Sequence, residues 1–109
     1  MENTYYVIIN PTTQKRLASY YFGAFCGGVK EVFRMRDDEW FMFRTYEEAV
    51  LKIERFNKDV DKWLNESIMI KQLPDWEAVG KADEFIKESK KTHKNLKNYI
   101  ARLKIEEVI

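Results

Sequence analysis

The stretch WFMFRTYEEAVLKIERFN, residues 40–57, decides the fold because the spacing of its apolar residues changes within it. The first residues are large and mostly apolar, which is typical of a strand. From Thr45 onward the apolar residues recur at three- and four-residue steps, the period of an amphipathic helix. Thr45 and Glu48 have the spacing of a capping box, in which the Thr45 hydroxyl accepts the Glu48 N–H and the Glu48 carboxylate reaches back to Thr45. We therefore expect a helix from Thr45 to about Asn65.

Upstream of this helix the chain has the pattern of β structure, because short aromatic and β-branched runs are separated by turn residues. The predicted strands form two hairpins and cover Thr4–Asn10, Arg16–Phe22, Val29–Met35 and Trp40–Arg44. Pro11 presets the backbone of the first hairpin loop. Three glycines between Gly23 and Gly28 indicate a loop or a bulge.

Downstream of the helix we expect a short apolar segment and then a long helix. Ser67–Leu73 is apolar and is followed by a proline, which predicts a fifth strand or an extended linker. Asp75–Glu107 has apolar residues near a 3.5-residue repeat, with no glycine or proline after Gly80. At 1.5 Å per residue this helix would be about 50 Å long. We expect it either to project and pair with another copy or to fold back near Lys91.

The length of 109 residues fits a single domain spanning 1–109. Residues 1–66 would form a β-meander plus helix, and residues 67–109 a short strand plus the long helix. The predicted fold class is α+β, with an antiparallel sheet of four or five strands packed by one amphipathic helix and followed by a long C-terminal helix or helical hairpin. No apolar run is long enough to cross a membrane. A single cysteine and the lack of a leader pattern predict a cytoplasmic protein.

Catalytic and metal motifs are missing from the sequence. Cys26 lies among glycines, but a nucleophilic cysteine needs a base, and the only histidine, His93, belongs to the distant last helix. A small apolar loop residue explains Cys26 better. One cysteine and one histidine cannot complete a structural zinc site. We therefore predict no catalytic residue, no metal and no cofactor.

Positive charge is concentrated near the C-terminus. Residues 86–104 contain seven basic groups against one acidic group, a balance of +6, whereas residues 1–66 have a balance of −1. Helical spacing places most of these cations on one face, which we predict to be a binding stripe: Lys87, Lys90, Lys91, Lys94, Lys97 and Arg102. Such a stripe can follow phosphates, meet an acidic protein surface, or serve only as a solvated face.

Two further sets of residues are candidate surfaces. Aromatic and arginine side chains of the predicted sheet can stack bases or anchor a protein partner, although core packing also explains most of them. This weaker set is Tyr6, Tyr20, Arg34, Arg36, Trp40 and Arg44. The apolar side of the long helix predicts the seam of a homodimer, because so long a helix exceeds what a small sheet can cover. The seam residues are His93, Leu96, Ile100 and Leu103.

The segments YYVIINPTTQKRLASYYF and WFMFRTYEEAVLKI resemble small accessory proteins of bacteriophages and mobile elements, in which a short hairpin domain precedes a capped helix. The opening Y-x-V strand followed by a TYEEA helix is also similar to the small hybrid-binding domain found ahead of some ribonucleases H. The chain lacks that domain's Trp and Lys placement between the strands, so no residue role is transferred. The first resemblance implies a binding-only inhibitor that occludes a host protein machine.

The sequence therefore favours a non-enzymatic interaction protein whose partner is a host protein or complex. The alternative is a nucleic-acid or nucleotide-binding module that uses the basic helix. An enzyme is the least favoured class, because neither a nucleophile with its base nor a cofactor loop is evident.

Overall fold

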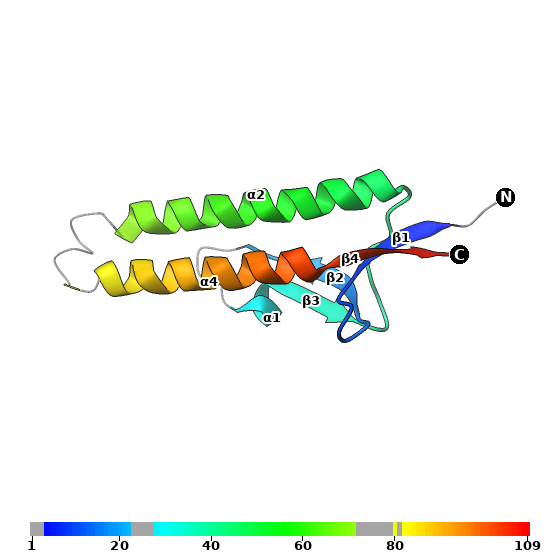
Figure 1. Ribbon diagram of the computed structural model, residues 1–109, viewed down its shortest axis with the longest axis horizontal. Coiled ribbons are helices and arrows are strands. Elements are labelled where there is room, and N and C mark those ends of the chain that lie inside the picture. Colours follow the sequence, from blue (N-terminus) through cyan, green and yellow to red (C-terminus); the bar gives the residue numbers. More distant parts are fainter. Residues whose placement is uncertain (1–3, 23–27, 72–79, 81) are drawn as a thin grey trace.

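The computed structural model describes residues 4–22, 28–71, 80 and 82–109. The molecule is elongated, with extents of 63 × 23 × 19 Å and a radius of gyration of 16.7 Å, against about 13 Å for a compact domain of this length. Two long helices lie side by side and extend beyond a small sheet (Figure 1). The predicted α+β class is confirmed.

The sheet has four strands in the order β3-β2-β1-β4, and all neighbouring strands are antiparallel. Their bounds are β1 Tyr5–Ile9, β2 Arg16–Tyr20, β3 Phe33–Arg36 and β4 Lys104–Val108. The strand β1 pairs with β4 along its whole length, whereas its register with β2 is confined to Ile9 and Arg16. The first predicted hairpin is confirmed, and its second strand ends at Tyr20 rather than Phe22.

The predicted strand Trp40–Arg44 is wrong. This segment instead fills the space where β1 and β2 separate. Phe41 donates its backbone N–H to the carbonyl of Leu17 at 2.9 Å, on the β2 side. Phe43 exchanges two backbone hydrogen bonds with Tyr6, at 2.8 and 2.9 Å, on the β1 side. The segment thus satisfies backbone groups of both strands without forming a ladder of its own.

The predicted strand Val29–Met35 is correct only in its second half. Its first part is a single helical turn, α1 (Val29–Val32), in which the N–H groups of Glu31 and Val32 donate to the Gly28 carbonyl at 3.1 and 3.2 Å. The turn allows the consecutive residues Val32 and Phe33 both to be buried. A strand would have directed them to opposite faces.

The helix after Thr45 is confirmed as α2 (Tyr46–Lys71), and its cap differs in one detail. Glu48 donates its N–H to the Thr45 hydroxyl at 3.1 Å, as predicted. Its carboxylate accepts the N–H of Arg44 at 3.1 Å instead of reaching Thr45. Because α2 continues to Lys71, the predicted fifth strand or linker is wrong over residues 67–71, and residues 72 and 73 lie outside the described part of the chain.

The long C-terminal helix is α4 (Ala82–Arg102), which lies antiparallel beside α2 (Figure 1). It neither folds back near Lys91 nor continues to Glu107, because the chain turns into β4 at Lys104. The predicted start at Asp75 lies outside the described residues. The helix ends where pairing of β4 with β1 offers the backbone a complete ladder of partners.

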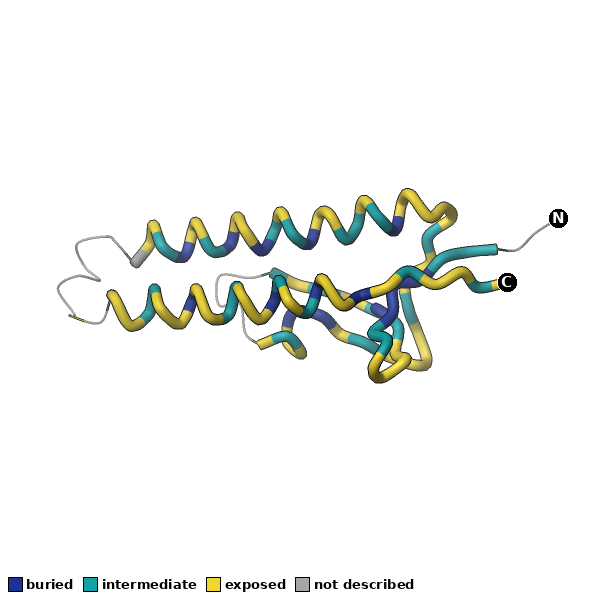
Figure 2. Tube along the Cα trace, in the orientation of Figure 1, coloured by how far each residue is buried: buried dark blue, intermediate teal, exposed yellow. Residues whose placement is uncertain are grey.

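The core lies between the sheet and the inner faces of α2 and α4 (Figure 2). Its buried residues are Ile8, Leu17, Val32, Phe33, Ala49, Phe56, Val60, Leu96, Ile100 and Leu103. Three of these, Leu96, Ile100 and Leu103, are the residues predicted to form a seam between copies. That prediction is wrong, because α2 and the sheet of the same chain already cover the apolar side of α4.

Candidate binding surfaces

The outer side of α4 carries the predicted basic stripe. Since Leu96 and Ile100 point into the core, residues on the opposite side of the helix are exposed to solvent. We call this surface the α4 lysine face and define it by Lys87, Lys90, Lys91 and Lys94. All four side chains are exposed, and none joins an ion pair with another described residue. The sequence-based prediction therefore places these four lysines correctly on one face.

Two predicted residues on α4 belong to the contact with α2 instead. His93 Nε2 lies 2.8 Å from Asp61 Oδ1, and Lys97 Nζ lies 3.5 Å from the same oxygen. The hydrogen bond from His93, followed by the charge of Lys97, lowers the pKa of Asp61 below its ordinary value. His93 and Lys97 therefore connect two helices of one chain, and Lys97 is not free to meet a partner as the other lysines are.

The outer side of α2 shows how an ordinary solvated helix face differs from the α4 lysine face. Two of its cations form ion pairs with a carboxylate one turn away, with Arg55 Nε at 3.3 Å from Asp59 Oδ1 and Lys62 Nζ at 3.9 Å from Glu66 Oε1. Such i,i+4 pairs neutralise the helix surface locally. A groove of about 610 Å³ along α2 has the same mixed character, because both acidic and basic residues, among them Glu54, Arg55 and Lys58, line it.

A second candidate surface is a cleft of about 690 Å³ at the β3 edge of the sheet. We call it the β3 cleft. The hairpin loop between β1 and β2, the turn α1, the strand β3 and the side chain of Tyr99 line it. Its cationic lining residues are Lys15, Lys30, Arg34 and Arg36, and no described lining residue is acidic. An adjoining hollow of about 210 Å³ shares Asn10, Thr13 and Tyr99 with the cleft and is bordered by Arg102.

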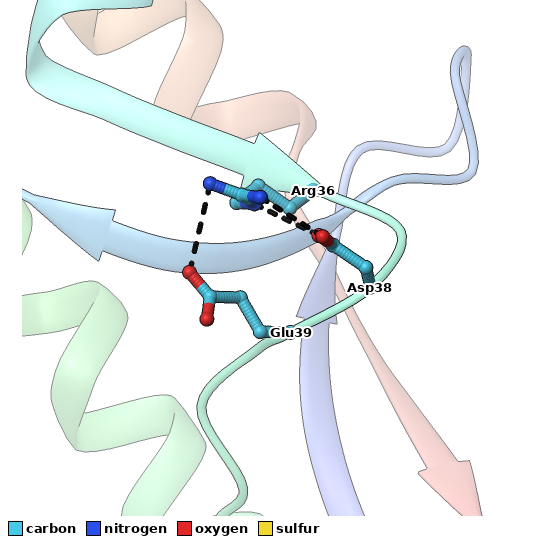
Figure 3. A network of polar contacts seen from close by, with 3 residues as sticks. All are labelled: Arg36, Asp38 and Glu39. Carbon is cyan, nitrogen blue, oxygen red and sulfur yellow. Dashed lines mark hydrogen bonds and ion pairs between the residues drawn. The ribbon is translucent and has the colours of Figure 1, made fainter.

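Arg36 is the one cation of the β3 cleft that is already neutralised (Figure 3). Its Nε and Nη2 donate to the two oxygens of Asp38 at 2.8 and 2.9 Å, and Nη1 lies 3.6 Å from Glu39 Oε1. The hydrogen bond to Asp38 raises the pKa of Arg36 and, in return, lowers the pKa of Asp38. Arg36 therefore stabilises the turn after β3. Its contacts do not support the predicted role in binding a partner.

The aromatic residues predicted to form a surface on the sheet are not brought together. The ring of Tyr20 packs against Phe56 with centroids 4.8 Å apart, and its hydroxyl accepts a hydrogen bond from Lys52 Nζ at 2.6 Å. Trp40 lies beneath the guanidinium of Arg16, 4.2 Å from the ring centroid.

The other three members of that set, Tyr6, Arg44 and Arg34, lie in separate places. Tyr6 makes an edge contact with Tyr46, with centroids 6.1 Å apart, and Arg44 presents its backbone N–H to the helix cap. Of the predicted sheet residues, Arg34 lies exposed in the β3 cleft without an ion pair to any described residue. Lys15, Lys30 and Tyr99 were not among the predicted site residues, because they come from separate segments and carry no local motif.

The catalytic and metal candidates can be placed only in part. Cys26 lies outside the residues that the structure describes. Within the described residues, no three His, Cys, Asp or Glu side chains gather closely enough to hold a metal ion. No helix in the same part of the chain is long and apolar enough to span a membrane. Comparison with protein-family models, with curated proteins and with solved structures finds no match to this chain. The function must therefore be argued from the surfaces themselves.

Proposed function

We propose that this chain is a non-enzymatic interaction protein that binds the acidic surface of a partner protein through the α4 lysine face. One observation carries the proposal: Lys87, Lys90, Lys91 and Lys94 are exposed on one side of a helix with no ion pair to any described residue. On the outer face of α2, in the same molecule, Arg55 and Lys62 are each ion-paired with a carboxylate one turn away. A surface with charge of one sign attracts a surface of opposite sign and raises the rate of association.

The geometry of the face suits a protein surface of modest size. Lys94 follows Lys87 by seven positions, which corresponds to about 10 Å along the helix axis. The packing of α4 against α2 and the sheet holds the helix backbone in place, so little backbone order is lost on binding. The resemblance to phage accessory proteins extends the proposal to a host protein as the partner and to the cytoplasm as its location. Self-association stays a prediction without assigned residues, since Leu96, Ile100 and Leu103 are core residues.

Nucleic acid is the second candidate partner, because the same row of cations can neutralise phosphates. Because of its residue types, the α4 lysine face would contact only the phosphate backbone of a nucleic acid. It contains lysines, which act as point charges, and no arginine or aromatic residue that would read a base edge or stack a base. Binding would then be independent of base sequence and would weaken steeply with salt.

Affinity capture from lysate, with and without nuclease, separates these candidates. The test variant is Lys87→Glu/Lys91→Glu/Lys94→Glu. The matched control, Arg55→Glu/Lys58→Glu/Lys62→Glu, makes the same change in net charge on the outer side of α2. Both sets of side chains are exposed, so we expect each variant to fold, with a change in unfolding free energy of about 1 kcal/mol or less.

Capture of a protein that survives nuclease, is lost in the α4 variant and is kept in the α2 control supports the proposal. Loss of all capture after nuclease, together with loss in the α4 variant, favours the nucleic-acid candidate. Equal capture by wild type and by the α4 variant overturns both and leaves the lysines as a solvated face.

A further inference from the structure

The β3 cleft is a second concave surface, separate from the α4 lysine face and not used by the function proposed above. Its volume of about 690 Å³ falls within the range of about 300–1,000 Å³ typical of small-molecule sites. Its walls come from four parts of the fold: the β1–β2 loop, α1, β3 and α4. The charge and polarity of these lining residues therefore determine which ligand the cleft can bind.

The charge of the walls favours an anion. Lys15, Lys30 and Arg34 line the cleft, and none of them is ion-paired within the described part of the chain. The fourth cation, Arg36, is satisfied by Asp38. Three cations thus face the cleft without a counter-charge, while the described lining residues include no carboxylate to repel an anion or to hold a divalent metal. A ligand carrying about three negative charges matches this set.

The apolar part of the cleft favours a flat ring on the same ligand. Val29, Phe33 and Met35 line it together with Tyr99, and the rings of Phe33 and Tyr99 are stacked with centroids 5.5 Å apart and an interplanar angle of 26°. Phe33 is buried, so this pair is held in place by the core. The Tyr99 hydroxyl accepts a hydrogen bond from Asn10 Nδ2 at 3.3 Å, which leaves its own proton available to donate to a ligand.

We propose that the β3 cleft binds a nucleoside diphosphate, with the phosphates at Lys15, Lys30 and Arg34 and the base against the apolar wall beside Tyr99. An inorganic anion would leave that apolar wall without a contact. An acidic peptide would distribute its charges along an extended backbone, whereas a diphosphate concentrates about three charges at one end of a flat group. The diphosphate therefore satisfies both halves of the cleft at once.

Calorimetric titration of the full chain with ADP and GDP tests this proposal, with adenosine and pyrophosphate as the two halves of the ligand. We expect at least one of the two nucleotides to bind at least tenfold more tightly than either half, because the half-ligands each use only one part of the cleft. Lys30→Gln and Arg34→Gln should each weaken nucleotide binding about fivefold or more, since each removes one charge interaction. Both side chains are exposed, so folding should be unaffected.

A matched control uses Lys87→Gln and Lys94→Gln, which remove equal charge from the α4 lysine face and should leave nucleotide affinity within about twofold of wild type. The lysate capture described above depends on that face and not on the cleft, so the two proposals can fail separately. Absence of binding by both nucleotides at millimolar concentration overturns the proposal. Pyrophosphate or a hexaglutamate peptide binding as tightly as the nucleotides also overturns it, because the cleft would then be a general polyanion site. The proposal is also overturned if the cleft variants and the α4 control variants lose nucleotide affinity to the same extent.

Discussion

The substitution Leu96→Ala distinguishes a core position within one chain from a seam between copies. Leu96 is 0% exposed and belongs to the cluster formed with Phe56, Val60 and Ile100. The change removes three carbons, worth about 0.8 kcal/mol each in transfer free energy, and leaves a cavity that adds to the loss. We expect the unfolding free energy to fall by about 3 kcal/mol, within the range of 2–5 kcal/mol typical of buried leucines. The melting temperature should fall by roughly 12–24 °C.

Urea unfolding followed by circular dichroism measures this loss, and it should be measured at two protein concentrations about a hundredfold apart. Stability that depended on dimer formation would change by roughly 2.7 kcal/mol over such a range, by mass action. Stability that belongs to a single chain has a midpoint independent of concentration. Because Leu96 lies in the core of one chain, we expect Leu96→Ala to lower the unfolding free energy by the same amount at both concentrations.

The control Leu51→Ala makes the same chemical change on the outer side of α2, where Leu51 is 62% exposed. It should change the unfolding free energy by about 0.5 kcal/mol or less. A cost below about 1 kcal/mol for Leu96→Ala, or a cost that changes with dilution, would refute the assignment of Leu96 to the core of one chain.

Three further predictions concern single residues of the fold and are all measured by urea unfolding. Thr45→Ala should cost about 1 kcal/mol because it removes the acceptor for the Glu48 N–H, and Thr45→Asp should restore most of that loss; no difference between the two variants would contradict the cap. Gly80→Ala should cost about 1 kcal/mol from backbone conformation alone, since Gly80 has φ of +75° and no neighbouring atom lies within 4 Å of an added Cβ; a neutral result would refute that conformation. Asp61→Asn should cost less than about 1 kcal/mol at pH 7, because the hydrogen bond with His93 and the ion pair with Lys97 are partly exposed. The difference in unfolding free energy between wild type and Asp61→Asn should be fully present above the ordinary pKa of an aspartate. It should disappear as the pH falls through the lowered pKa of Asp61, because the carboxylate must be charged to stabilise the fold. A difference that survives at about pH 2 would exclude this cause.

The parts of the fold that could be predicted from the sequence are those specified by neighbouring residues. The start of α2 depends on Thr45 and Glu48, which are three residues apart and form their hydrogen bond locally. The strands β1 and β2 lie within one or two residues of their predicted bounds, because a turn containing Pro11 separates them. The α4 lysine face was predictable for the same reason, since helical spacing alone places its residues on one side.

The parts that could not be predicted depend on partners far along the chain. Lys104–Val108 continues the apolar spacing of α4 and contains no glycine or proline, so its sequence is compatible with a helix. It is a strand because β1, about a hundred residues earlier, offers a full ladder of backbone partners. Residues 67–71 have strand-like composition but remain helical within α2, which lies beside α4.

The failure to predict β4 and the failure to predict the β3 cleft have one physical cause. The antiparallel register of β1 with β4 places Ile9 opposite Lys104, so Asn10 comes next to the end of α4. There the Asn10 amide donates to the Tyr99 hydroxyl, and the loop that follows Asn10 brings Lys15 to the same side as Arg34. If α4 continued to Glu107, β4 would not pair with β1. Asn10 would then not be held beside Tyr99, and no cleft would form there. The pairing of β1 with β4 therefore both ends α4 and builds the cationic site against its last turn.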